Sequence, residues 1–157
     1  MDYISYGSNM NIEQMACRCP HTKIYGNGKL IGWKLVFNYH ADIIETGNKE
    51  DFVPVVVWKL DNKSDQQSLD RYEGYPFYYT KIITSVTMDN GEVIRAMVYV
   101  MADERKGIYP PSASYFYGIK DGYIANNIDL APLYKAMAES CKPNNQTEFN
   151  QYNPRKE

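Results

Sequence analysis

Hydrophobic positions in this chain follow two spacings, one typical of strands and the other typical of helices. Short runs rich in β-branched and aromatic residues predict strands at residues 2–6 and within 22–60 and 77–101. Apolar residues at helical spacing predict four helices, over residues 11–17, 64–73, 112–122 and about 129–141. No repeat or linker divides the chain, so we expect one domain over residues 1–141 and a flexible polar tail over 142–157.

The β-rich middle of the chain contains its most hydrophobic run, FVPVVVWKL at residues 52–60, which we expect to form a central strand. Pro54 must then lie at the start of that strand or at a sheet edge, because proline cannot donate a ladder hydrogen bond. Residues 30–39 are predicted as one further strand, in which Gly32 marks a bulge or a bend. An Asn-Gly pair between the last two β runs predicts a hairpin.

The turn Gly7-Ser8-Asn9, between the first strand and the first helix, is a candidate binding feature. Gly7 removes side-chain bulk where the backbone turns, and Asn9 or Asn11 is placed to cap the helix that follows. Unpaired N–H groups in such a turn, at the positive end of a helix, suit a carboxylate or a developing oxyanion. Many turns of this sequence have no binding role, so a binding role here depends on further residues elsewhere in the chain.

Polar residues and glycines also mark the ends of the later helices. Ser64 and Gln67 form a capping box at the start of the second helix, and Gly74 suits a left-handed residue at its end. Ser112 is the predicted cap of the third helix, which Gly122 would end.

Composition excludes several classes of function. The chain has 157 residues, enough for one domain with its own core, and a net charge of −2, which gives no sign of a nucleic-acid or membrane-surface partner. No apolar run approaches the length of a membrane span, and the first residues do not form an ordinary signal peptide. Tyrosine is frequent, at 15 residues, and suits sites that recognise amides and carboxylates.

Three cysteines, Cys17, Cys19 and Cys141, lack the spacing of a disulfide framework and suit a reducing compartment, so we expect a cytoplasmic protein. Cys17, Cys19 and His21 are close enough to suggest a metal, but no second ligand pair follows at zinc spacing. The alternative, a loop that leaves the first helix and is stopped by Pro20, is the one we favour.

Glu73 is the acidic residue that fits a surface position least well. It lies in the last turn of its helix, beside an apolar stripe that includes Leu69 and Tyr72. The negative end of the helix dipole and any burial both raise the pKa of a carboxyl group there. A carboxyl group tuned toward neutrality is what general acid–base catalysis requires. The alternative is a solvated glutamate that merely ends the helix.

Two motifs together resemble a known family. Tyr6-Gly7-Ser8-Asn9 follows the first strand, and Leu69-Asp70-Arg71-Tyr72-Glu73-Gly74-Tyr75-Pro76 comes later in the chain. In this order they resemble the γ-glutamylcyclotransferase family, also called AIG2-like or butirosin-biosynthesis-like. The segment Pro111-Ser112 to Gly122, with Tyr115, looks like its third motif, and the resemblance covers about residues 1–125. It implies a mixed α+β fold with a small barrel-like β-sheet and a few short flanking helices.

The resemblance also implies a reaction. In such enzymes the α-amine of a γ-glutamyl amide attacks its own γ-carbonyl group, which forms 5-oxoproline and releases the amine without a metal, a cofactor or a covalent intermediate. Glu73 would be the general acid and base. Gly7, Ser8 and Asn9 would hold the substrate carboxylate or the oxyanion through backbone N–H groups.

Four tyrosines are further candidates for the site. Tyr6 and Tyr115 would shape the γ-glutamyl pocket, although each also suits the core. Tyr75 and Tyr78 lie near Glu73 in the sequence and are candidates for the leaving-group side. The sequence does not identify the leaving amine or the oligomeric state. An alternative of another class is a module that binds a γ-glutamyl or amino-acid-like ligand without turnover, although a pure binder has no need for Glu73.

Overall fold

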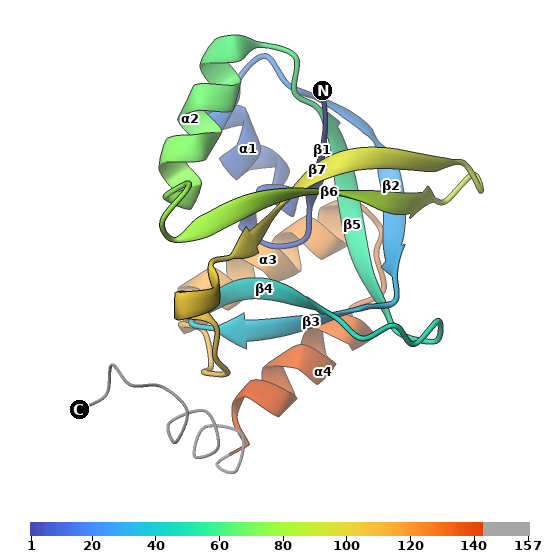
Figure 1. Cartoon of the computed structure of the whole chain (residues 1–157), viewed down its shortest axis with the longest axis vertical. Coiled ribbons are helices and arrows are strands. Elements are labelled where there is room, and N and C mark those ends of the chain that lie inside the picture. The colour runs from blue at the N-terminus through green and yellow to red at the C-terminus, as the bar shows by residue number, and fades with distance from the viewer. Residues whose placement is uncertain (143–157) are drawn as a thin grey trace.

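A closed barrel of five strands forms the centre of the fold in the computed structural model (Figure 1). Around the barrel the strands are β1 (Asp2–Ser5), β5 (Phe52–Lys59), β2 (Lys23–Ile31), β6 (Tyr79–Met88) and β7 (Val93–Met101). Neighbouring strands are antiparallel, except that β1 and β7 pair in parallel and close the barrel. The predicted hairpin is confirmed as β6 and β7, and the mixed α+β class with a barrel-like sheet is confirmed with it. The structure describes residues 1–142, so the predicted tail lies outside the described residues apart from Lys142.

The predicted central strand is confirmed as β5, which pairs with β1 on one side and β2 on the other. Its valines at positions 53, 55, 56 and 57 are fully buried. Pro54 lies opposite Lys29 of β2, before the first residue of β5 that pairs with β1. The proline therefore occupies a strand start with a neighbour on one side, as its missing N–H predicts.

The prediction of one strand over residues 30–39 is wrong, because the chain turns at Gly32, where φ is +83°. Leu30 and Ile31 end β2, whereas β3 (Trp33–Asn38) pairs with β4 (His40–Glu45) in a separate two-stranded sheet. A residue with a side chain adopts such a φ only with strain. Gly32 thus marks the break between two sheets rather than a bulge within one.

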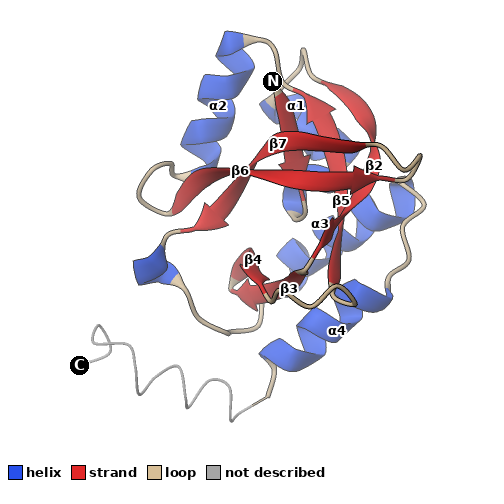
Figure 2. Ribbon diagram, turned by 45° about the vertical axis from the view of Figure 1, so that its right-hand side comes forward, coloured by secondary structure: helices blue, strands red, loops and turns tan. Residues whose placement is uncertain are grey.

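In the described part of the chain, residues 1–142, four α-helices and two short 3₁₀ helices surround the strands. They are η1 (Ser8–Met10), α1 (Ile12–Arg18), α2 (Lys63–Glu73), η2 (Asp103–Arg105), α3 (Ala113–Ala125) and α4 (Ala131–Ser140). α1 and α2 pack together on one side of the barrel, and α4 packs under β3 (Figure 2). No helix within residues 1–142 has the length and apolar character needed to cross a bilayer.

The helix boundaries follow the capping residues, with one exception at the start of α2. Asn11, one of the two predicted candidates, caps α1, since its side chain accepts a hydrogen bond from Gln14 N. Asn62 caps α2 by accepting from Asp65 N at 3.1 Å, so the capping box predicted at Ser64 is wrong. Asparagine caps as well as serine does, and it comes two residues earlier. Gly74 ends α2 in the left-handed conformation, with φ +64°, as predicted.

The third helix begins as predicted but does not end at Gly122. Ser112 caps α3, and the helix continues to Ala125. Gly122 is buried where α3 crosses the η1 segment: a Cβ at this position would lie 2.8 Å from the Met10 carbonyl carbon and 2.9 Å from Asn11 N. The glycine therefore allows close packing of two backbones instead of ending the helix.

Candidate active site

A cavity of about 340 Å³ opens where the end of β1 meets the end of α2. Most of the predicted site residues line it: Tyr6, Gly7, Ser8, Asn9, Glu73, Tyr78 and Tyr115. The other lining residues are Tyr3, Ile4, His40, Ala41, Arg71, Tyr72, Gly74, Tyr79 and Tyr99. The walls therefore come from β1 and the turn after it, the end of α2, β6, β7 and α3, and the tip of the β3–β4 hairpin.

Glu73 is the acid of this cavity. Its Oε1 accepts a hydrogen bond from Asn9 Nδ2 at 2.8 Å, across 64 residues of sequence. Burial raises the pKa of the Glu73 carboxyl group to about 7, while the charge of Arg18 and the hydrogen bond from Asn9 pull the pKa down against that effect. A carboxyl group with this pKa can both accept and release a proton at neutral pH.

Side chains from β1, α1 and α2 form hydrogen bonds with the turn after β1. Asn9 is buried, and its Nδ2 also donates to Tyr3 Oη at 2.8 Å. Ser8 Oγ lies 3.0 Å from Tyr72 Oη, and Arg18 Nη1 donates to Asn9 Oδ1 at 2.6 Å. These contacts fix the position of the turn relative to Glu73 at the end of α2.

Gly7 is packed closely by two residues from elsewhere in the chain. A Cβ at position 7 would lie 3.1 Å from Ala41 Cβ and 3.4 Å from Tyr115 Oη. Ala41 N donates to the same Tyr115 Oη at 3.0 Å. Burial raises the pKa of Tyr115, so its hydroxyl stays neutral and holds the hairpin tip beside the turn.

Tyr6 lines the cavity, while its hydroxyl forms a hydrogen bond within the barrel. The hydroxyl donates to the Tyr99 carbonyl group at 2.7 Å, which ties the end of β1 to β7. Tyr99 in turn donates to Asp70 Oδ1, which also pairs with Lys81 Nζ at 2.7 Å. The aspartate of the Asp70-to-Pro76 motif thus fixes a tyrosine of the cavity wall.

The two tyrosines predicted for the leaving-group side lie in different places. Tyr78 lines the cavity, and its hydroxyl lies 2.8 Å from His40 Nδ1. Tyr75 is 40% exposed and is not among the lining residues; its ring lies 4.3 Å from Lys81 Nζ. The structure brings Tyr78 to the site and leaves Tyr75 beside it.

The sequence and the fold were compared with known proteins. The family model described as gamma-glutamyl cyclotransferase, AIG2-like, matches residues 3–117. The chain belongs to this family. It is 32% identical to bovine gamma-glutamylcyclotransferase, over 90% of this chain and 79% of the bovine protein, and 30% identical to the human protein of that name, over 92% and 80%. A solved structure named gamma-glutamyl cyclotransferase matches with a TM-score of 0.74 and 29% identity, over 88% of this chain and 86% of that one.

The part that matches the gamma-glutamyl cyclotransferase model contains every residue of the cavity wall. Among the residues that sequence reasoning missed are Tyr72 and His40 of this wall, and Arg18, which lies behind it. Arg18 reads as an ordinary basic residue at the end of a short helix, and His40 reads as part of a turn. Tyr72 lies inside the recognised motif, but no pattern distinguished it from a packing residue.

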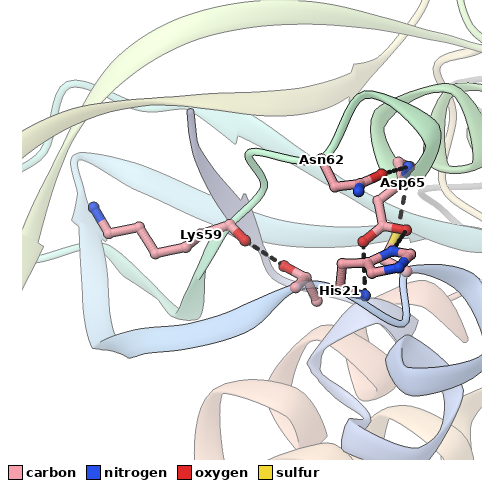
Figure 3. Close-up of polar contacts among 6 residues, drawn as sticks. His21, Lys59, Asn62 and Asp65 are labelled. Atoms are coloured by element: carbon pink, nitrogen blue, oxygen red, sulfur yellow. Dashed lines mark hydrogen bonds and ion pairs between the residues drawn. The ribbon is translucent and has the colours of Figure 1, made fainter.

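The side chains of Cys17, Cys19 and His21 do not point to one common site in this family member. Cys17 is exposed, whereas Cys19 is buried with its Sγ 3.5 Å from the Asp65 carbonyl oxygen. Figure 3 shows the imidazole of His21 against the Asp65 carboxylate, with Nδ1 3.1 Å from Oδ1. Within residues 1–142 no three His, Cys, Asp or Glu side chains come together as metal ligands.

Proposed function

We propose that this protein is a γ-glutamylcyclotransferase, which converts a γ-glutamyl amide into 5-oxoproline and a free amine or amino acid. The observation that carries the proposal is a glutamate with a pKa of about 7, held by Asn9 inside a cavity in a chain of this family. A carboxyl group of that pKa suits an acid–base cycle at neutral pH.

In the proposed reaction Glu73 moves protons from the α-nitrogen of the substrate to the leaving nitrogen. The ionised Glu73 accepts a proton from the α-ammonium group of the substrate, and the freed amine attacks the γ-carbonyl carbon. The new C–N bond closes a five-membered ring and leaves a tetrahedral oxyanion. Protonated Glu73 gives this proton to the leaving nitrogen, and the bond to that nitrogen breaks as the oxyanion collapses. The ring nitrogen then passes its second proton through the Glu73 carboxylate to the released amine, which leaves as an ammonium ion. Nucleophile and electrophile both belong to the substrate, so the balance needs no cofactor.

The turn after β1 is the proposed anion site. Among residues 1–142 no acceptor pairs with the backbone N–H groups of Ser8 and Asn9. Such groups can bind the substrate carboxylate or the oxyanion of the tetrahedral intermediate. Close packing at Gly7 keeps the turn fixed in front of Glu73.

The tyrosines of the wall fit a γ-glutamyl chain. A cavity of about 340 Å³ is within the usual range for a small-molecule site. Tyr6 and Tyr115 would hold the glutamyl chain folded, so that its amine and γ-carbonyl group meet, which is a proximity effect. Tyr78 would face the leaving amine, and Tyr75 would meet only the part of a long leaving group that extends out of the cavity.

The cysteines support a reducing compartment. Cys17, Cys19 and Cys141 are all free thiols in the structure, and two of them are exposed. The cytoplasm is the location we propose, and the free thiols support it.

The proposed function is tested with a panel of γ-glutamyl dipeptides and γ-glutamylamines. Each is incubated with the folded protein, and 5-oxoproline is measured by mass spectrometry. We expect release of 5-oxoproline from at least one member, in equal amount to the freed amine. Binding of panel members without any 5-oxoproline would overturn the proposal in favour of a ligand-binding module.

A further inference from the structure

The guanidinium group of Arg18 contacts four groups behind the turn. Nη1 donates to Asn9 Oδ1 at 2.6 Å, and Nη2 donates to Gln14 Oε1 at 2.8 Å. The central carbon lies 3.6 Å from the centre of the Tyr72 ring, close enough for a cation–π contact. Nη1 also lies 3.3 Å from Ser8 Oγ. Arg18 lines no part of the cavity wall, so it acts on the site through its neighbours.

Arginine fixes the orientation of the Asn9 amide because a guanidinium group can donate hydrogen bonds but cannot accept them. The oxygen of the Asn9 side chain must therefore face Arg18, and the nitrogen must face the opposite way. On that side both amide hydrogens have acceptors, Glu73 Oε1 at 2.8 Å and Tyr3 Oη at 2.8 Å. Asn9 is 3% exposed, so a reversed amide has no water to satisfy it.

We propose that Arg18 is a positioning residue of the reaction: by fixing the Asn9 amide it holds the Glu73 carboxylate in place for proton transfer. This inference rests on the proposed function. The charge of Arg18 and the hydrogen bond from Asn9 both favour the ionised form of Glu73, because each lowers the pKa of its carboxyl group. Loss of Arg18 removes the charge and frees the amide to turn.

Buried phenol groups and one imidazole surround Glu73. Phenol groups face it from β1, β6, β7 and α3 and from the turn, and burial raises the pKa of each of them; they are Tyr3, Tyr6, Tyr79, Tyr99 and Tyr115. Burial lowers the pKa of His40, which keeps the imidazole neutral. On α2 itself, Asp70 is paired with Lys81, while Arg71 and Tyr72 line the wall. Arg18 is the charge that acts on the pKa of Glu73, so a change in this titration after loss of Arg18 is assigned to Arg18.

The test compares Arg18→Met and Arg18→Lys with the wild-type protein. Methionine keeps apolar length over the Tyr72 ring but has neither the charge nor the donors, whereas lysine keeps the charge. Arg95→Met, on an exposed part of β7, controls for the loss of one positive charge. Titration of the Glu73 carboxyl group is followed by carbon NMR without substrate, and kcat and KM are measured against pH.

For Arg18→Met we expect the Glu73 midpoint and the acid limb of kcat to move up by about one pH unit, with kcat at neutral pH about tenfold lower and KM little changed. Arg18→Lys should recover most of the shift, and Arg95→Met should behave as wild type. An unchanged Glu73 midpoint in folded Arg18→Met would overturn the inference. Absence of 5-oxoproline from every protein would instead count against the proposed function, and the NMR titration would still decide the role of Arg18.

A measurement on the wild-type protein covers the case in which Arg18→Met does not fold. The side-chain NH₂ signals of Asn9 should shift with the same midpoint as Glu73, because one of these hydrogens is bonded to the carboxylate. Signals that stay constant through that titration would contradict the orientation that Arg18 is inferred to impose.

Discussion

At the scale of single residues, the site depends on opposing effects on one carboxyl group. Burial disfavours the charge of Glu73, while Arg18 and Asn9 favour it, and the balance leaves a pKa of about 7. The sequence predicted a raised pKa from the position of Glu73 beside an apolar stripe in the last turn of its helix. It could not predict the counteracting groups, because Asn9 was expected at the site only through its backbone N–H group and Arg18 was not a candidate.

This balance makes the stability of the fold depend on pH. The folded pKa of Glu73, about 7, lies above its ordinary value of 4.5, so the folded state keeps a proton that the unfolded chain releases. Stability from this group is therefore complete below the lower value and is lost as the pH rises to the upper one. Between about pH 5 and pH 8, wild type should lose about 2 kcal/mol of unfolding free energy relative to Glu73→Gln. Urea unfolding of both proteins measures the difference, and parallel pH profiles would contradict the burial of this acid.

At the scale of elements, two helices fix the turn after β1. The end of α2 supplies Glu73, and α3 packs against the backbone of η1 at Gly122. Capping residues and the β-turn glycines predicted where most elements begin and end. Gly122 and Gly32 were misread, because a glycine inside a pattern signals a need for space or for positive φ without saying which one.

The packing at Gly122 is tested with a matched pair of glycines in α3. Gly122→Ala places a Cβ 2.8 Å from the Met10 backbone, which cannot move aside, so we expect a loss of stability of about 1–3 kcal/mol and lower activity. Gly118→Ala meets only the end of the Gln14 side chain and should change stability by less than about 1 kcal/mol. Thermal unfolding of both variants compares them at equal gain in helix propensity. Equal stabilities would show that the η1 crossing is looser than the structure indicates.

At the scale of the whole molecule, the barrel brings together segments that are distant in sequence. The parallel pairing of β1 with β7 and the antiparallel pairing of β1 with β5 place the end of β1 next to the end of α2. The family motifs predicted this meeting of the turn and Glu73, because they belong to one known site. The hairpin tip with His40 and Ala41 was not predicted, since its place depends on the break at Gly32 and on long-range packing.

The central claim, that Glu73 carries the proton between the two nitrogen atoms, is tested most directly by the turnover of Glu73→Gln. Glutamine keeps the shape and can still accept the hydrogen bond from Asn9, but it cannot cycle a proton. Release of 5-oxoproline should fall by about 100-fold or more, while substrate binding stays within about threefold of wild type. Glu45→Gln, an exposed glutamate on β4, is the matched control and should keep full activity. Near-normal turnover by folded Glu73→Gln would contradict the account.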